Sequence, residues 1–404
     1  MRVNLRAQLG VKLPFIGLIF FTSLSILLSY LKFLPCRSTN FASFELLSKS
    51  CYSDIGVFWN LKGLSMDLWA YKPSNPIEYP VIIGIFISCM AWLTNQLDST
   101  AVTFFDINSM FLSLFFIGTV FLLRKINQKS WIYLSVCPIV SLTLFMNWDM
   151  LALFFSLCSI YFFDKGKLKY SGFMLGLAIS TKFFPIVLIF PATAILIRKK
   201  ILKNNIFNFY LFALSSWVLV NLPVALFSFQ GWTQFYRLSF SRKIGDGSIW
   251  EALELLGFNF SNINLYYSFS FIALIGVLIF YILRGKYELN LAQSAYWSLF
   301  AFLFLIKVYS PQYVIWVAGF ALLAIRNRRQ IYAFLTWQVT EVSFHYAIWQ
   351  FYIFRGTNGL GGLPPEVYAY SLALRFLGLS LLFYTLYFMR ADGTKSKGDF
   401  GVIH

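Results

Sequence analysis

Long apolar runs separated by short polar turns make up most of the chain. A run such as 13-LPFIGLIFFTSLSILLSYL-31 is long enough to cross a hydrocarbon core as a helix, which takes about 20 apolar residues. The pattern predicts an all-α polytopic membrane protein, a bundle of about 12 transmembrane helices forming one domain over residues 1–404. The expected spans are about 13–34, 103–123, 131–146, 149–164, 168–182, 184–198, 207–227, 265–284, 291–308, 311–325, 331–350 and 366–389.

Two longer polar segments interrupt this pattern, at about 35–102 and 228–264, and we expect both on the outer side of the membrane. The first contains the apolar run 81-VIIGIFISCMAWL-93. Apolar runs of about 10–14 residues are more typical of interfacial or re-entrant pieces than of spans. We therefore expect an amphipathic helix on the outer membrane surface there, and a true span is the alternative.

Charge supports this topology. Only 12% of the residues are charged, against about 25% in soluble domains. Apolar runs end in basic clusters that together hold 21 of the 33 Lys and Arg and only four acidic residues, so one membrane face carries the whole net charge of +17. Cytoplasmic loops are enriched in Lys and Arg, which predicts a multi-pass protein of the cell (plasma) membrane with both termini cytoplasmic. This asymmetry lends no support to a nucleic-acid partner.

Polar and ionisable residues gather at one level, near the outer ends of the predicted spans. Such side chains are costly inside lipid and mark functional positions by default. Their common level predicts a polar chamber that opens outward. The residues are Asp54, Glu78, Asp149, Lys182, Arg242, Lys243, Asp246, Ser248, Lys307, Gln312, Tyr313, Glu341, His345 and Arg355, with Arg375 inside the last span.

Simpler interpretations exist for several of these residues. Asp149 follows Asn147 at a helix start and could cap that helix. Lys182 and Lys307 could extend to the lipid headgroups, although cations on the outer face oppose the charge bias. Arg375 could be a salt-bridge partner within the bundle.

Further residues carry weaker signals. His345 could be an interior histidine, and Glu251 and Glu254 are expected on a solvated helix face. Cys36 and Cys51 fall in one outer loop, where they are either a disulfide or two free thiols. The scattered Cys and two His predict no metal site of the usual His and Cys type, although carboxylates leave room for a divalent cation.

Seven short motifs recur in the same order in a known family. The chain resembles the GT-C glycosyltransferases that use polyprenyl-phosphate sugars. It is most similar to the bacterial polyprenol-phosphate-mannose-dependent α-mannosyltransferase group (glycosyltransferase family 87, DUF2029 type). The matching motifs are YSDIGVFW, IEYPV, MNWDMLAL, SGFMLGLAISTKFFPIVLIFP, NLPVALFSFQGW, SRKIGDGSIW and YSPQYVIW, between about 50 and 316. Beyond Trp316 the chain matches only in hydropathy.

The resemblance implies a hexosyltransferase of cell-envelope biosynthesis whose active site is extracytoplasmic. It implies inverting transfer of a sugar, most closely mannose, from a polyprenyl-phosphate donor to a hydroxyl of a glycolipid or glycan acceptor. The family places the general base on Asp54, and an exposed carboxylate with a pKa of about 4 is ionised near pH 7. No cofactor is expected besides this lipid-linked donor substrate. In this fold class, amphipathic helices on the membrane surface occupy the first outer loop.

The departing phosphate requires fixed cations, and other polar residues would orient the sugars. The phosphate-binding candidates are Lys182, Arg242, Lys243 and Lys307. The orienting candidates are Glu78, Tyr79, Asp149, Asn147, Gln312, Tyr313 and His345, and those for stacking on sugar rings are Trp59, Trp69 and Trp250.

Two other classes remain open at this point. A transporter or flippase of anionic lipid-linked sugars would use similar cations, but transporters often show paired halves with broken helices near the midplane. No internal repeat is visible, and the polar residues lie at the outer boundary. An assembly subunit would leave the outer carboxylates and lysines without a role. Turnover of a polyprenyl-phosphate sugar separates these possibilities.

Overall fold

The computed structural model describes residues 3–42, 44–128, 130–285 and 289–389, with side chains from Ile16 onward. Parts of the predicted basic clusters, at 2, 129, 286 and 390–397, lie outside the described residues. The described residues form helices and no strands. The α-helices are α1 Val3–Lys32, α2 Leu34–Arg37, α3 Glu45–Ser48, α4 Asp54–Leu61, α5 Val81–Asn95, α6 Ala101–Ile126, α7 Trp131–Ser135, α8 Pro138–Thr143, α9 Asp149–Asp164, α10 Leu168–Thr181, α11 Ile189–Arg198, α12 Lys203–Phe227, α13 Phe229–Ser241, α14 Ile249–Leu255, α15 Ile263–Arg284, α16 Leu291–Phe304, α17 Val314–Ala324, α18 Arg328–Gly356 and α19 Pro365–Tyr387; the short 3₁₀ helices are η1 Phe184–Leu188 and η2 Pro311–Tyr313.

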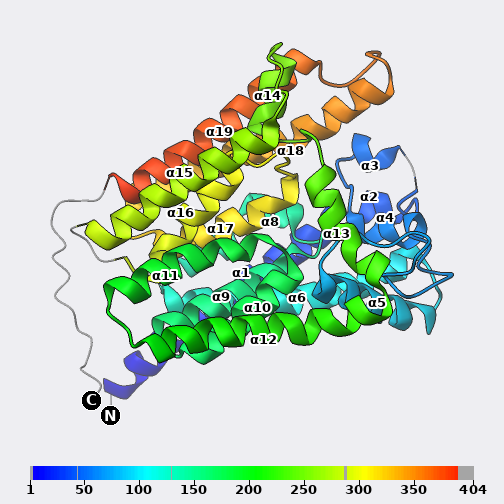
Figure 1. Cartoon of the computed structure of the whole chain (residues 1–404). Helices are drawn as coiled ribbons and strands as arrows, with labels where there is room; N and C mark the ends of the chain where they lie inside the picture. The colour runs from blue at the N-terminus through cyan, green and yellow to red at the C-terminus, as the bar shows by residue number, and fades with distance from the viewer. Residues whose placement is uncertain (1–2, 43, 129, 286–288, 390–404) are drawn as a thin grey trace.

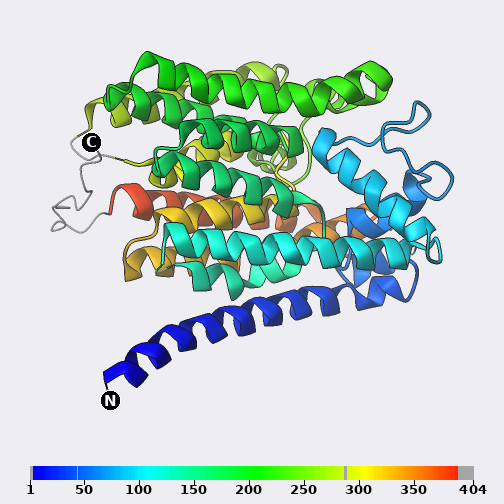
Figure 2. The same cartoon turned by 90° about the horizontal axis from the view of Figure 1, so that it is seen from below.

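The long helices lie side by side in one bundle (Figures 1 and 2). Helix α1 begins, and α19 ends, at the same end of this bundle. The short helices α2 to α4 and their connecting loops gather at the opposite end, called the loop end below. Helix α13 runs across the loop end rather than along the bundle (Figure 1). The two long polar segments expected from the sequence therefore lie at one end.

Four of the described helices are long and apolar enough to cross a membrane, judged by length and composition: α6, α12, α15 and α19. Shorter apolar helices cover Ile16–Lys32, Val81–Asn95, Phe184–Arg198, Leu291–Phe304 and Pro311–Ala324. This composition is that of a multi-pass membrane protein. The number of about 12 spans stays a prediction.

Three predicted spans are less regular than expected, each at a proline. The span at 131–146 divides into α7 and α8, because Pro138 lacks an N–H group and restricts the residue before it. The spans at 184–198 and 311–325 each begin as a 3₁₀ turn that contains Pro185 or Pro311. Pro185 and Pro311 therefore lie where these two segments begin.

Helix α5 has 15 residues, about 22 Å at the rise of an α-helix, which is shorter than a hydrocarbon core of about 30 Å. It lies near the loop end, oblique to α6 (Figure 2). Its position is compatible with the expected surface helix, and whether it spans the membrane stays open.

Helices α10 and α12 approach each other closely through small residues. A Cβ atom at Gly172 or Gly176 would collide with the backbone carbonyls of Phe209 or Ala213. Ser216 donates from Oγ to the Phe173 carbonyl at 2.9 Å across the same interface. Small residues spaced four apart allow such close packing in membrane bundles.

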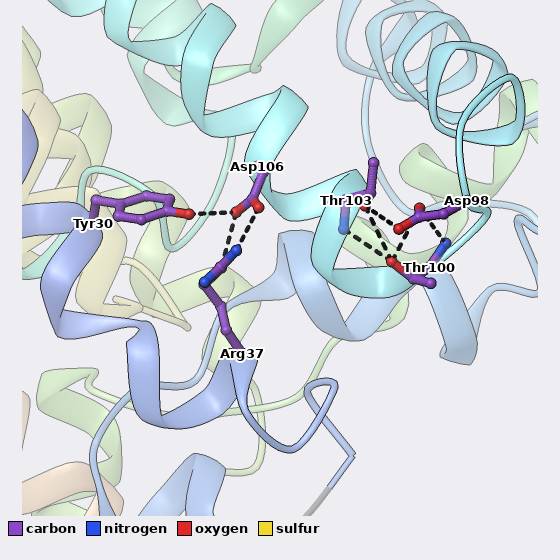
Figure 3. Close-up of polar contacts among 6 residues, drawn as sticks. All are labelled: Tyr30, Arg37, Asp98, Thr100, Thr103 and Asp106. Carbon is purple, nitrogen blue, oxygen red and sulfur yellow. Dashed lines mark hydrogen bonds and ion pairs between the residues drawn. The ribbon is translucent and has the colours of Figure 1, made fainter.

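Polar contacts fasten the start of the first outer loop to α6 (Figure 3). Arg37 Nε donates to Asp106 Oδ1 at 2.9 Å, and Tyr30 donates to the same oxygen at 2.9 Å. Cys36 and Cys51 are joined as a disulfide, so the structure answers the alternative that the sequence left open. The segment leading to Asp54 is thereby tied to the end of α1.

Candidate active site

A cavity of about 1010 Å³ opens among the segments of the loop end. Its walls come from α3, α4, α13, α15, α16, α17, α18, η1, η2 and the loops between them. The sequence-predicted residues that line it are Asp54, Glu78, Tyr79, Lys182, Arg242, Asp246, Lys307, Gln312 and Tyr313. Residues from separate motifs, up to 259 positions apart in the chain, therefore face one space.

Asp54 is the first residue of α4 and is held on several sides. The preceding Ser53 caps α4 by accepting from the Ile55 N–H at 3.2 Å, which fixes where the helix begins. Asp54 Oδ1 accepts from the Tyr52 hydroxyl at 2.8 Å. Its Oδ2 accepts from the Tyr79 hydroxyl at 2.9 Å and from Asn147 Nδ2 at 2.7 Å. The carboxylate thus has a defined orientation at the cavity wall.

Asp54 is half-buried, which corrects the expectation of an exposed carboxylate with an ordinary pKa. Burial raises the pKa of Asp54 above 3.8, and the hydrogen bonds from Tyr52 and Tyr79 and the charge of Lys182 act in the opposite direction. Burial and the adjacent Asp54 charge also raise the pKa of Tyr52 and Tyr79, so both phenols remain hydrogen-bond donors. A carboxylate of raised pKa is a stronger base once it is ionised.

Asp149, which lies behind the cavity wall, forms an ion pair with Lys182, which lines the cavity. Lys182 Nζ lies 3.1 Å from Asp149 Oδ1 and 4.3 Å from the centre of the Tyr79 ring. Trp316 Nε1 donates to the same Asp149 oxygen at 3.1 Å. Asp149 is fully buried, and its side chain makes no capping bond to the start of α9, contrary to the capping interpretation. Lys182 is 7% exposed and faces the cavity rather than extending to headgroups.

Three aromatic rings form a continuous stack on one side of the cavity. Trp316 lies 3.9 Å from Phe184 and 3.9 Å from Tyr313, with nearly parallel planes. All three rings line the cavity. The stack provides an apolar surface next to the Lys182 ammonium group.

Backbone hydrogen bonds join the segment 242–248, which carries Arg242, to the segment 307–309, which carries Lys307. The Gly245 N–H donates to the Lys307 carbonyl at 2.9 Å, and the Tyr309 N–H donates to the Asp246 carbonyl at 3.0 Å. Lys307 Nζ also donates to the Arg242 carbonyl at 2.8 Å. Lys307 and Arg242 are consequently held on the same wall of the cavity. Glu78 stands on another part of the lining, 3.5 Å from Lys62 Nζ.

Other predicted site residues do not line the cavity. Asn147 and Asp149 lie behind the wall and act on Asp54 and Lys182. Lys243 is exposed beside it. His345 is fully buried, with Nε2 3.0 Å from Lys32 Nζ, in keeping with an interior histidine.

The residues expected to stack on sugars lie elsewhere. Trp59 is 2% exposed and packs on Phe104, while Trp69 and Trp250 donate their indole N–H groups to Ser228 and to the Leu305 carbonyl. None of the three lines the cavity. Arg355 lies over the Phe351 ring and also stays outside the lining.

A second polar cluster lies sealed behind the loop 242–248. Arg375 Nε donates to Glu341 Oε2 at 2.8 Å, and both side chains are fully buried. Arg375 Nη1 donates to the carbonyls of Tyr309 at 2.5 Å and Gly247 at 3.1 Å. Gly247 has φ +78°, and a Cβ there would collide with the Tyr309 carbonyl, so the loop requires glycine. The salt-bridge interpretation of Arg375 is therefore confirmed.

Glu251 belongs to this second cluster, which corrects the expected solvated helix face. Its Oε2 accepts from the Gly247 N–H at 2.7 Å and from the Tyr368 hydroxyl at 3.1 Å. Burial raises the pKa of Glu251 to about 7. Glu254 is exposed, as expected.

The sequence did not single out Tyr52, Phe184 and Trp349 as site residues, and all three line the cavity. The sequence could have indicated Tyr52 as a site residue, because it lies two positions before Asp54. Trp349 lies in the part of the chain that no family motif covers. Among the described residues, no group of three or more His, Cys, Asp or Glu side chains is placed to hold a metal ion.

Comparison with known proteins gives a distant relative. The chain is 24% identical over 233 residues to GPI mannosyltransferase 1 of Kluyveromyces lactis. The match covers 52% of this chain and 57% of the yeast protein, so the chain spans a little over half the length of that relative. No family model matches the chain. The similarity connects this helical membrane protein, at a distance, with a mannosyltransferase.

Proposed function

We propose that the protein is a membrane glycosyltransferase that transfers mannose from a polyprenyl-phosphate donor to an acceptor hydroxyl. The observation that carries the proposal is the position of Asp54. It lies on the wall of a cavity of about 1010 Å³ that is also lined by Lys182, Arg242 and Lys307. A base and several cations around one space suit a displacement that creates a phosphate anion.

In the proposed reaction, the acceptor oxygen attacks the anomeric carbon of the donor sugar. Asp54 takes the proton of the acceptor hydroxyl while the new carbon–oxygen bond forms. The bond between the anomeric carbon and the phosphate oxygen breaks with its electron pair, so polyprenyl phosphate departs. Attack opposite the leaving group inverts the anomeric configuration.

The cations have distinct environments for this task. Arg242 and Lys307 belong to the joined segments, with Lys307 half-buried and Arg242 exposed. Lys182 is paired with Asp149, which holds its ammonium group in place. Fixed donors stabilise a developing charge without reorganising during the reaction. We assign the phosphate to these three side chains.

The distant mannosyltransferase relative supports mannose as the sugar. The Cys36–Cys51 disulfide supports an extracytoplasmic loop end, because disulfides persist in oxidising compartments. The basic turns at the opposite end of the bundle then face the cytoplasm. The polyprenyl donor requires a site at headgroup depth, which suits a cavity at the end of the bundle.

The test is turnover by the purified protein in detergent. The donor is polyprenyl-phosphate mannose, the acceptor is methyl α-mannoside, and mass spectrometry follows free polyprenyl phosphate and the mannosylated product. We expect both products in equal amounts, with the anomeric configuration of the transferred sugar inverted. If proteoliposomes move intact donor between leaflets and no sugar is transferred, the protein is a carrier and the proposal is wrong.

A further inference from the structure

One wall of the cavity is aromatic. It combines a residue of the first outer loop with residues of α18, a helix that no family motif covers. Tyr52 precedes α4, whereas Trp349 and Tyr352 lie on α18. The Tyr52 and Trp349 rings are 5.3 Å apart, and Trp349 and Tyr352 are 6.1 Å apart. All three side chains line the cavity. We call these residues the Trp349 wall.

The Trp349 wall is a different surface from the Phe184–Trp316–Tyr313 stack. The stack adjoins Lys182, which pairs with Asp149 through the same carboxylate oxygen that Trp316 contacts. The Trp349 wall instead adjoins Asp54, because the Tyr52 hydroxyl donates to Asp54 Oδ1. One aromatic surface therefore lies beside a cation and the other beside the proposed base.

Trp349 has an unsatisfied donor. Its side chain is 4% exposed, and its indole N–H has no hydrogen-bond partner within the part of the chain that the structure describes. A buried N–H without a partner is rare and costs free energy, which a bound oxygen atom would recover. This is an independent indication that the wall meets a polar ligand.

The two oxygens of Asp54 also differ. Oδ2 accepts hydrogen bonds from Tyr79 and Asn147, whereas Oδ1 accepts one, from Tyr52. A carboxylate oxygen has two lone-pair positions, so Oδ1 retains one for a further proton donor. The hydroxyl that gives up its proton therefore approaches on the Tyr52 side, where the Trp349 wall stands.

We propose that the Trp349 wall binds the ring of the acceptor and that this acceptor is an uncharged sugar. The proposal rests on the proposed function. The apolar C–H face of a sugar ring packs on aromatic side chains, while its hydroxyls bond to polar groups. Here these groups are the indole N–H of Trp349 and the Asp246 carboxylate, which lines the same cavity as Tyr352. Anionic acceptors are disfavoured beside Asp54 and Asp246, and the cations assigned to the donor phosphate are Lys182, Arg242 and Lys307.

The decisive variants are Trp349→Phe and Trp349→Ala. Trp349→Phe keeps a ring and removes the N–H, so the KM for methyl α-mannoside should rise about 2- to 10-fold. Trp349→Ala also removes the stacking surface, and the KM should rise about 10- to 100-fold. The KM for polyprenyl-phosphate mannose and kcat at saturating acceptor should stay within about threefold of the parent for both variants. Trp92→Phe, at an exposed position outside the cavity, is the matched control and should change neither KM.

A binding measurement without donor separates this proposal from the function on which it rests. Methyl α-mannoside should change the tryptophan fluorescence of the parent and of Trp92→Phe, and this response should be lost in Trp349→Phe. If the parent protein transfers no sugar, the proposed function fails, and the fluorescence titration still decides whether the wall binds a sugar. An unchanged acceptor KM in a folded Trp349→Phe, an equal fluorescence response, or a raised donor KM overturns the proposal. If Trp349→Ala does not fold, Trp349→Phe alone decides.

Discussion

Two polar clusters lie within the same end of the bundle, and they differ in what they face. The cavity cluster is Asp54, Tyr79, Asn147, Asp149 and Lys182, of which three side chains line open space. The sealed cluster is Arg375, Glu341, Tyr309, Gly247 and Glu251, and none of its members lines the cavity. Each contains one buried ion pair, at 3.1 Å in the first and 2.8 Å in the second.

The carboxylates of the two pairs are bonded differently, although Arg375 Nη2 also has no partner among the described residues. Glu341 accepts from Arg375, Tyr309 and Trp337, so both of its oxygens have partners. Asp149 Oδ1 accepts from Lys182 and Trp316, whereas its Oδ2 has no partner among the described residues. A buried carboxylate whose two oxygens are both bonded is held in one orientation, whereas one with an unbonded oxygen beside a cavity retains capacity for a ligand. We infer that the sealed cluster positions the loop 242–248 and that the cavity cluster performs the chemistry.

The strongest test of this division is Asp54→Asn. Asparagine keeps the shape and one acceptor oxygen but cannot take a proton, so sugar transfer should fall about 10²- to 10⁴-fold. Donor binding and thermal stability in detergent should change little. The rate of the parent protein should also fall with decreasing pH, starting above the ordinary carboxyl range, because burial raises the pKa of Asp54.

Transfer assays of Asp54→Asn beside Glu78→Gln and Asp149→Asn in matched membranes check this assignment. If Asp54→Asn keeps near-normal transfer while Asp149→Asn abolishes it, Asp149 is the base and the division between the clusters must be redrawn.

Arg375→Ala tests the sealed cluster. The variant leaves the Glu341 carboxylate buried without its cation, and breaking such a pair costs about 3–5 kcal/mol of stability. Denaturant titration in a single detergent measures the unfolding free energy. The double variant Arg375→Met/Glu341→Gln is the control, and it should recover part of the loss because it removes both charges. A stability of Arg375→Ala equal to that of the parent would show that the cluster does not support the loop.

Lys182 and Lys307 test the cations of the cavity. Removing a charge-assisted contact to the donor phosphate costs about 1.5–3 kcal/mol, so Lys182→Ala should slow transfer about 10- to 150-fold. Lys307 is half-buried and more solvated than Lys182, so Lys307→Ala should have the smaller effect. Steady-state kinetics with varied donor measures both. Lys165→Ala, at the exposed turn that ends α9 on the side opposite Asp149, is the control for loss of a lysine.

Lys182→Ala also leaves Asp149 buried without its cation. The double variant Lys182→Ala/Asp149→Asn separates the two consequences, because it removes both charges together. Stability should recover in the double variant while the rate remains low. Recovery of the rate as well would mean that Lys182 only neutralises Asp149, and the phosphate site would then lie nearer to Arg242.

The sequence predicted the helical bundle and much of the cavity lining, for identifiable reasons. Asp54, Glu78 and Lys182 each lie in short motifs at the ends of apolar runs, and ionisable residues at such places are costly without a role. Hydropathy also located α9, α12 and α15 within a few residues. It did not locate the interruption at Pro138, because an apolar run looks the same whether one helix or two cross it.

The missed residues depend on contacts between distant segments. Trp349 packs against Tyr52, which lies 297 positions earlier in the chain, and no local sequence pattern predicts this contact. Glu251 and Glu254 are three positions apart in α14, a spacing that predicts one solvated helix face, yet Tyr368 of α19 donates a hydrogen bond to Glu251. The sequence predicted stacking tryptophans in the outer loops, but Trp59 is buried in the core.

The smallest expected effect concerns Glu251 and the pH dependence of stability. Its pKa is about 7 in the folded protein, against an ordinary value of 4.5. The folded state therefore binds more protons than the unfolded state between about pH 4.5 and pH 7, and stability should fall as pH rises through this window. Each unit of pKa shift corresponds to about 1.4 kcal/mol, so the full change is at most about 3.5 kcal/mol and will be smaller where water reaches the carboxyl. Unfolding free energies of the parent and Glu251→Gln across pH 4–8 measure it, because glutamine keeps an acceptor for the Gly247 N–H and does not titrate. If the two proteins show the same pH dependence, Glu251 does not contribute to it, and the sealed cluster holds the loop through Arg375 and Glu341 alone.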